Sequence, residues 1–391
     1  MLKDIIILSP FLVSLFWIIH FFSNRKRNSR SQNIWAIALG LMTITGAIHA
    51  FYWYIDENSY SLFYKLDIIE CFSTLLFIPM LFLYFRELTG DKDEKSRWKI
   101  ALLFIPPLLF SVASASFYLL TGEEYATLFT KLKIESNGTA SVESIPYHQI
   151  LWIINEYTYS LLFSIQAVVV VVYAIRRLII YRNHLCDFFS DIEGKDTKYY
   201  WAVLGGLLIF LTVVAVSGLS GYMLYTEYSA GVSVFLLLYG GCIYFMCFHV
   251  FRTQYTAADF EKELALSDAE EYPKISREQS NSYTRILSSF NKLIDEDKIF
   301  LRKDLRVDTV ARLIYTNRTY ISRMLREEYQ CNFWEFINRK RIEYAKEQTV
   351  FHPALTQEEI ARISGFTHNS AFSRAFKEYE RTTFREWRKT L

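Results

Sequence analysis

The stretch that decides the fold of the C-terminal third is residues 356–379, which read TQEEIARISGFTHNSAFSRAFKEY. Thr356 is followed three residues later by Glu359, which is the pattern of a helix-capping box. The tripeptide SGF at 364–366 indicates a turn, and apolar residues at helical spacing return over 369–379. Two short helices joined by a tight turn are typical of a helix-turn-helix unit.

The same layout occurs once more upstream. A short helix is expected over 308–314, a turn and N-cap over 315–317, and a second helix over 318–329. A long helix from 333 to about 349 joins the two units and spans roughly 25 Å at 1.5 Å per residue. That length suits two reading helices held about one duplex turn apart. The sequence therefore predicts a tandem helix-turn-helix domain with double-stranded DNA as its partner.

Charge divides the chain at Arg252. Residues 1–251 are about 15% charged and residues 252–391 about 34%, so a single soluble domain is excluded. Residues 302–391 carry 18 Lys and Arg against 12 Asp and Glu, a modest basic excess that favours nucleic acid. We therefore expect a membrane domain over 1–251, a cytoplasmic linker over 252–282 and a DNA-binding domain over 283–391.

The first 251 residues contain repeated apolar stretches long enough to cross a bilayer, each needing roughly 20 residues. We expect seven spans, at Ile5–Phe22, Asn33–Tyr54, Leu62–Phe85, Lys99–Leu120, Gln149–Ile175, Tyr199–Tyr225 and Ala230–Phe251. The fold class is thus all-α: a seven-span bundle in a lipid bilayer, followed by the tandem helix-turn-helix domain. The loop over 121–148 is the long external one, and its Asn137-Gly138 pair favours a small β-hairpin.

Lys and Arg in the connecting loops set the expected orientation. Fourteen of them lie in one set of loops and four in the opposite set, which includes the N-terminus. Positive loops stay on the cytoplasmic side. The N-terminus is therefore expected outside a bacterial cytoplasmic membrane, and everything after Arg252 inside.

Polar residues on the second helix of each unit are the candidates for reading DNA. Arginine pairs bidentately with guanine, asparagine suits adenine, and small hydroxyls contact several bases. The competing interpretation is that these residues form solvated helix faces. Phosphate contacts or surface charges are the interpretations for five basic side chains, one of which also belongs to this set: Arg326, Arg339, Lys340, Arg341 and Lys377. The candidates are Arg318, Thr319, Ser322, Arg323 and Arg326 in the first unit, and Asn369, Ser370, Ser373 and Arg374 in the second.

At these residues the chain resembles the AraC/XylS family of bacterial transcription regulators. The resemblance covers about 283–391 and is carried by NRTYISR at 317–323, FWEFINRKR at 333–341, Ala345, EIA at 359–361, SGF at 364–366 and FSRAFK at 372–377. The seven-span part is similar to the membrane-bound variants of this family. The resemblance implies activation or repression at promoters, RNA polymerase as a further partner, a possible homodimer, and a variable N-terminal part that senses a signal.

Four positions depart from the family pattern. Tyr315, Gln330 and Arg381 stand where the family usually has glycine, and Phe384 stands where it often has proline. A side chain at a left-handed turn position costs on the order of 1 kcal/mol. We therefore expect a stability penalty or an altered turn rather than loss of the fold.

Ionisable residues at similar depth in the spans suggest a site for an unknown small-molecule or envelope signal, because buried charge in a membrane is costly. The alternative is a hydrogen-bonded network that only holds helices together. The candidate residues are His49, Asp67, Glu70, Asn155 and Glu156, accompanied by Tyr52, Tyr157 and Tyr159. Their spacing does not require a metal, and the sequence indicates no cofactor.

Other classes fit less well. Seven spans do not divide into the equal inverted halves of a transporter. The last span lacks the lysine that a retinal protein needs, and no catalytic pair or metal motif indicates an enzyme. The alternative that remains is a seven-helix receptor whose cytoplasmic helical domain recruits a protein partner instead of DNA.

Overall fold

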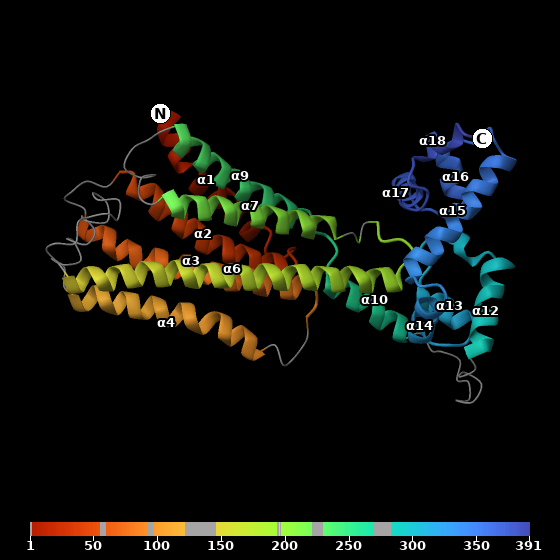
Figure 1. The fold of residues 1–391 in the computed structure, drawn as a ribbon, viewed down its shortest axis with the longest axis horizontal. Coiled ribbons are helices and arrows are strands. Elements are labelled where there is room, and N and C mark those ends of the chain that lie inside the picture. The colour runs from red at the N-terminus through yellow and green to blue at the C-terminus, as the bar shows by residue number, and fades with distance from the viewer. Residues whose placement is uncertain are drawn as a thin grey trace. The chain divides into compact units, whose positions relative to one another are not determined.

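The computed structural model describes residues 2–54, 60–91, 97–121, 146–193, 195, 197–220, 230–269 and 283–391. Long apolar helices make up the N-terminal part (Figure 1). They are α1 (Leu2–Ser23), α2 (Arg30–Tyr52), α3 (Tyr60–Leu88), α4 (Arg97–Thr121), α6 (Pro146–Phe188), α7 (Lys198–Ser220) and α9 (Ala230–Arg252). Each predicted span corresponds to one of these helices.

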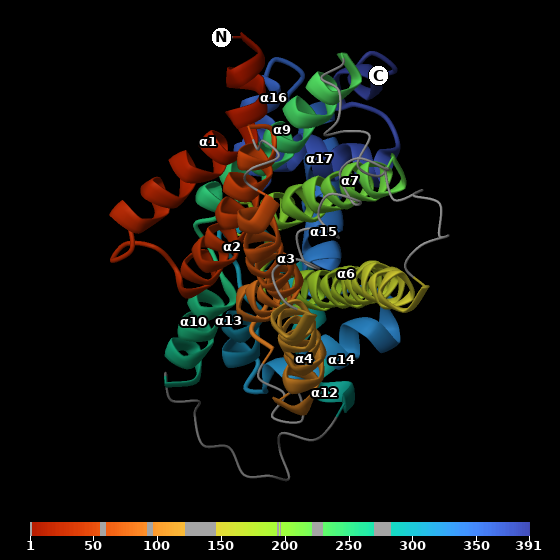
Figure 2. The same ribbon diagram turned by 90° about the vertical axis from the view of Figure 1, so that its left-hand side faces the viewer.

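The helices pack in an order that differs from their order along the chain. α2 packs against α1 and α3, α1 and α7 both pack against α9, and α4 packs against α3 (Figure 2). Polar side chains fasten several of these pairs: Gln32 donates to the backbone oxygens of Val250 and Thr253 at 3.0 and 3.2 Å, and the Trp35 ring nitrogen lies 3.4 Å from the Cys247 sulfur. Such bonds give helix pairs a fixed register in a bilayer, where apolar packing alone is less directional.

Six of these helices have a described stretch that is long and apolar enough to cross a membrane. In α4 the stretch with described side chains is shorter, Ile100–Ser116. Many of their apolar side chains face outward, including Phe16, Leu109 and Val168. A helix that exposes leucine, valine and phenylalanine along its outer face is suited to lipid and not to water.

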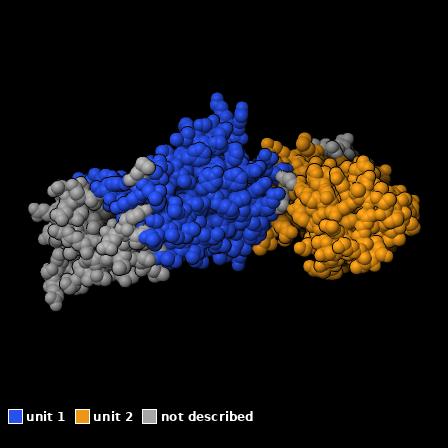
Figure 3. Space-filling model, turned by 90° about the horizontal axis from the view of Figure 1, so that it is seen from above, with its two compact units in different colours: residues 1–178, 197–258 blue, residues 179–196, 259–391 orange. Residues whose placement is uncertain are grey.

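The chain forms two compact units, coloured separately in Figure 3. The first comprises residues 1–178 and 197–258, and the second comprises 179–196 and 259–391. Residues 259–269, and the end of α6 with the loop that follows it, both belong to the second unit. Neither feature could be anticipated from local sequence patterns.

The regular elements in the described part of the second unit are helices and one isolated bridge. Its tandem units are α13–α14 and α16–α17, joined by α15. The bounds are α10 (Ala257–Ala269), α12 (Tyr283–Asp295), the short 3-10 helix η4 (Ile299–Leu301), α13 (Val307–Leu313), α14 (Arg318–Glu328), α15 (Phe333–Phe351), α16 (Gln357–Ile363), α17 (Asn369–Glu380) and α18 (Phe384–Arg388). The helices expected over 308–314, 318–329, 333–349 and 369–379 correspond to α13, α14, α15 and α17, whose ends differ from the expected ones by at most two residues.

Aromatic and aliphatic side chains form the core of the second helix-turn-helix unit. Phe366, Phe372, Phe376 and Phe384 are buried together with Ile342 of α15. Phe384, in the position where proline is common in related proteins, is the first residue of α18 and adds its ring to this cluster.

Side-chain caps begin α14, α15, α16 and α18 of this unit. Thr356 and Glu359 form the expected capping box: the Thr356 hydroxyl accepts from the Glu359 amide, and the Glu359 carboxylate accepts from the Thr356 amide at 2.8 Å. The hydrogen bonds that the Thr356 amide and hydroxyl donate to the Glu359 carboxylate lower the pKa of Glu359. Asn317 caps α14 by accepting from the Tyr320 amide at 3.0 Å. The residue at which each of these helices begins is therefore determined by side chains next to it in the sequence.

The three positions that lack the usual glycine do adopt left-handed backbone. Tyr315, Gln330 and Arg381 have φ of 56°, 53° and 57°. The fold is kept, as expected, and these residues carry the strain that glycine would remove. The hairpin suggested at Asn137-Gly138 lies outside the described residues.

Candidate nucleic-acid interface

The first recognition helix, α14, buries one face and exposes the other. Ile321, Met324 and Leu325 are buried. Among the candidate DNA-reading residues on the other side, Thr319, Arg323 and Arg326 are exposed, while Arg318 and Ser322 are half-buried. Arg323 pairs with Glu327 one turn along the helix, at 3.2 Å.

The second recognition helix, α17, repeats this division. Phe372, Ala375 and Phe376 are buried, whereas all four candidates, Asn369, Ser370, Ser373 and Arg374, are exposed. Gln357 at the start of α16 donates to the Asn369 side-chain oxygen at 2.9 Å and to the Ser373 hydroxyl at 2.8 Å. The polar face therefore has a defined arrangement before any nucleic acid is present.

Acidic side chains from residues 179–196, which belong to the same compact unit, contact both recognition helices. Asp187, near the end of α6, forms an ion pair with Arg326. Glu193, in the loop before α7, lies 3.3 Å from the Arg374 guanidinium and accepts a 2.6 Å hydrogen bond from Ser370. Sequence reasoning missed both residues; the only available signal was their acidic charge in a loop set that is otherwise rich in Lys and Arg.

Arg341 has a different place from the one expected. It was a candidate for a phosphate contact or a surface charge, but its side chain is fully buried. Its Nε donates to the Phe300 carbonyl at 2.7 Å, and its Nη2 donates to the Arg302 carbonyl at 2.8 Å and lies 3.3 Å from the Ser190 hydroxyl. Burial lowers its pKa to about 10, so it stays charged at neutral pH. Helical spacing cannot distinguish this role from a surface one.

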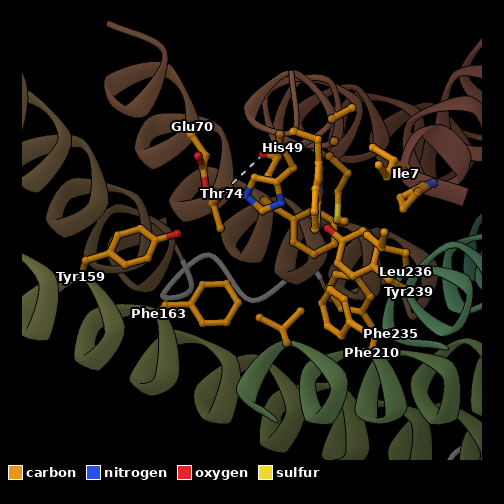
Figure 4. Close-up of a pocket in the computed structure, with 18 residues that line it drawn as sticks. Ile7, His49, Glu70, Thr74, Tyr159, Phe163, Phe210, Phe235, Leu236 and Tyr239 are labelled. Carbon is orange, nitrogen blue, oxygen red and sulfur yellow. Dashed lines mark hydrogen bonds and ion pairs between the residues drawn. The ribbon is translucent and has the colours of Figure 1, made fainter. Parts of the chain in front are cut away.

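A cavity of about 120 Å³ lies within the membrane unit (Figure 4). Its polar end holds His49 and Glu70, whose Nε2 and Oε1 atoms are 2.7 Å apart, and Tyr52 donates to the other Glu70 oxygen at 2.9 Å. The rest of the wall is mostly apolar and comes from α1, α2, α3, α6, α7 and α9: Ile7, Pro10, Met42, Thr45, Gly46, Ala50, Trp53, Thr74, Phe77, Tyr159, Phe163, Phe210, Val214, Phe235, Leu236 and Tyr239.

The structure brings together some of the residues expected at a membrane site. His49 and Glu70 line the cavity, and Tyr159 faces them from α6 (Figure 4). Asp67 is in α3 but is not among the lining residues. Asn155, Glu156 and Tyr157 belong to α6, and their side chains lie outside the described residues. The apolar walls were missed because a phenylalanine that lines a cavity has the same sequence pattern as one that packs in a core.

Two family models match the chain. Residues 310–390 match a helix-turn-helix domain, and residues 6–189 match the N-terminal seven-transmembrane region of histidine kinases. The chain is also similar to the Msm operon regulatory protein of Streptococcus mutans, with 32% identity over 114 residues, which are 28% of this chain and 38% of that protein. The chain thus matches well under half of that regulator's length. No solved structure matches.

These matches define the class of protein. The helix-turn-helix match falls on the two units built by α13–α14 and α16–α17, and the membrane match falls on the N-terminal helices. The chain is a multi-pass membrane protein whose C-terminal domain is a helix-turn-helix domain of the AraC type.

Proposed function

We propose that this protein is a sequence-specific transcription regulator of the bacterial cytoplasmic membrane that couples a signal reaching its membrane domain to promoter binding. It acts without catalysis, with its N-terminus outside and its DNA-binding domain in the cytoplasm. RNA polymerase is its further partner at the promoter, and a second copy of the chain is a possible one.

One observation carries this proposal. Two helices, α14 and α17, each bury an apolar face and expose a face with arginine and small polar side chains. Arg323 and Arg374 occupy equivalent positions on these faces and are both exposed. Two similar reading faces in one chain suit two successive major grooves. A surface that served only to bind a protein would not need this repeat.

The role of Arg374 is open to a direct test. The full chain in lipid nanodiscs is used to select duplexes from a random pool, and affinity is then measured on the selected site and on a scrambled one. Arg374→Ala should weaken specific binding by ~1–3 kcal/mol and relax the preference at one base position. Arg323→Ala should do the same at a different position, because it lies on the other recognition helix.

Lys292→Ala serves as the matched control, since it removes a positive charge from α12, outside both helix-turn-helix units. It should leave the ratio of specific to scrambled affinity unchanged. If Arg374→Ala and Arg323→Ala also keep that ratio, these residues do not read bases. If no duplex is selected at all, recruitment of a protein partner becomes the better interpretation of the C-terminal domain.

The signal is proposed to bind in the cavity of the membrane unit. A small molecule with an apolar body and one polar or cationic group would match walls of phenylalanine, leucine and isoleucine with Glu70 and His49 at one end. The cavity draws its walls from six helices, so a ligand there contacts most of the bundle. A ligand with different affinity for two packings of the bundle shifts the population between them.

Glu70→Gln should abolish the transcriptional response to the signal, because the bundle then stays in one packing whether or not the ligand is present. Glutamine has nearly the same shape but no charge, and it cannot accept from both His49 and Tyr52. Transcription is measured from a promoter that carries the selected site while a panel of small molecules is added one at a time. The signal molecule should change wild-type transcription by about tenfold, and this change should be absent in Glu70→Gln. Glu87→Gln, which removes a carboxylate of α3 outside the cavity and paired with Arg30, is the control. A Glu70→Gln protein that responds like the wild type would exclude this site.

A further inference from the structure

The end of α6 and the loop after it are built into the DNA-binding unit. We refer to residues 185–193 as the clasp. Leu185, Phe188, Phe189 and Ser190 of the clasp are buried. The Phe188 and Phe189 rings pack on Phe260 of α10, at 5.6 and 5.8 Å between ring centroids. Such burial holds the segment in one conformation.

Backbone and side-chain hydrogen bonds fasten the clasp further. Phe189 and Arg306 form an antiparallel bridge, and the Ser190 amide donates to the Leu305 carbonyl at 3.0 Å. Asn338 of α15 donates to the Ser190 carbonyl at 3.3 Å. The clasp is therefore joined to the segment before the first helix-turn-helix unit and to the helix between the two units.

Two carboxylates extend from this anchored segment to the reading faces. Asp187 pairs with Arg326 of α14, and Glu193 holds both Arg374 and Ser370 of α17. The carboxylate-bearing side chains are mostly covered, 22% and 21% exposed, whereas the two arginines are 60% and 55% exposed. One acidic group is thus placed on each of the two helices that would enter the major groove.

We propose that the clasp is an intramolecular competitor of DNA and that this structure is the state in which DNA is excluded. The inference rests on the proposed function, since it concerns the regulation of the same reading surface. The Glu193 carboxylate holds the Ser370 hydroxyl and lies against Nη2 of Arg374, so a phosphate or base edge must displace it to bind those two groups. The two carboxylates also repel the phosphates of an approaching duplex.

The ion pairs of the clasp with the two recognition helices are weak enough for a conformational change to break them. The arginine of each pair is open to solvent, which weakens the pair and makes it depend on geometry, so a small displacement of the clasp is enough to break it. The clasp continues directly from α6 and leads into α7. Both helices contribute walls to the membrane cavity, through Tyr159 and Phe163 of α6 and Phe210 and Val214 of α7. A ligand that shifts α6 and α7 would therefore move the two helix ends to which the clasp is connected along the chain.

Affinity measurements on the full chain test the inference. The selected duplex is titrated against the wild type and against the double variant Asp187→Asn/Glu193→Gln, in nanodiscs at one salt concentration. The double variant should bind roughly tenfold more tightly, because the competing pairs and the repulsion are both removed. Glu193→Gln alone should show an intermediate gain, because it frees only α17.

The control is Asp297→Asn/Glu347→Gln, which removes the same two charges at exposed sites elsewhere in the unit. It should change affinity by no more than about twofold, since its effect comes only from net charge. Equal affinities for the wild type and the clasp variant would overturn the inference and leave the proposed function standing. An equal gain in the control would overturn it as well. Absence of selective binding by every variant would overturn the proposed function together with the inference.

Discussion

Gly365→Ala is expected to destabilise the DNA-binding unit by ~2–5 kcal/mol, enough to abolish binding by the second helix-turn-helix unit. Gly365 lies in the turn between α16 and α17 with φ of +84°. A Cβ placed there would be 2.8 Å from both the Cα and the carbonyl oxygen of Leu301. Left-handed backbone costs a side chain about 1–2 kcal/mol, and overpacking against rigid neighbours adds about 1–3 kcal/mol.

The measurement is a urea titration of the detergent-solubilised full chain, with proteolysis of the C-terminal unit as the readout. Gln330→Gly provides the opposite case, because Gln330 has a side chain at φ of 53° and glycine would relieve it. That variant should gain up to about 1 kcal/mol. A Gly365→Ala protein as stable as the wild type would mean that the turn and the Leu301 backbone separate easily.

Arg341→Ala is expected to cost about 3–5 kcal/mol in the same unit. The substitution leaves two carbonyl acceptors, the buried one of Phe300 and the partly buried one of Arg302, without their charged donor. Each hydrogen bond to a charged group contributes about 1.5–3 kcal/mol. The guanidinium also lies 5.5 Å from the centre of the Phe366 ring, so one side chain connects the segment before the first helix-turn-helix unit with the turn of the second.

Arg339→Ala is the matched control, since Arg339 is exposed two residues away on the same helix. It should change stability by no more than about 0.5 kcal/mol. Arg341→Lys should recover only part of the loss, because an ammonium group lacks the planar fork that reaches both carbonyls. The assignment fails if Arg341→Ala and Arg339→Ala unfold at the same urea concentration.

The two substitutions also separate stability from recognition. Neither Gly365 nor Arg341 belongs to the exposed faces of α14 and α17, so both should weaken DNA binding only as far as they unfold the unit. Arg374→Ala should have the reverse pattern, with weaker and less selective binding at unchanged stability. The three variants together therefore distinguish a scaffold residue from a reading residue.

Much of the architecture could be predicted from local patterns. The spacing of apolar residues located each long N-terminal helix, and the capping residues Asn317 and Thr356 located the starts of α14 and α16. The left-handed backbone at Tyr315, Gln330 and Arg381 agrees with the missing glycines of the family pattern. These features depend on contacts between residues within a few turns of one another, so short stretches of sequence are enough to define them.

Burial was harder to assign. Arg341 follows two other basic residues, Arg339 and Lys340, and the sequence offers no sign that only one of the three is enclosed. The distinction arises because η4 and the clasp bring the carbonyls of Phe300 and Arg302 and the hydroxyl of Ser190 to one point. The same reason applies to the cavity, whose phenylalanines are brought together from different helices.

By itself, the sequence determined that this protein has a helical membrane domain and a tandem helix-turn-helix domain, because hydrophobic period, capping and charge act over short distances. Only the tertiary structure decided which polar side chains meet. Glu193 and Ser370 are separated by 177 positions in the chain yet share a hydrogen bond, and Asp187 reaches Arg326 across 139. Such pairs depend on how whole helices pack, and no local pattern of charge specifies the partner.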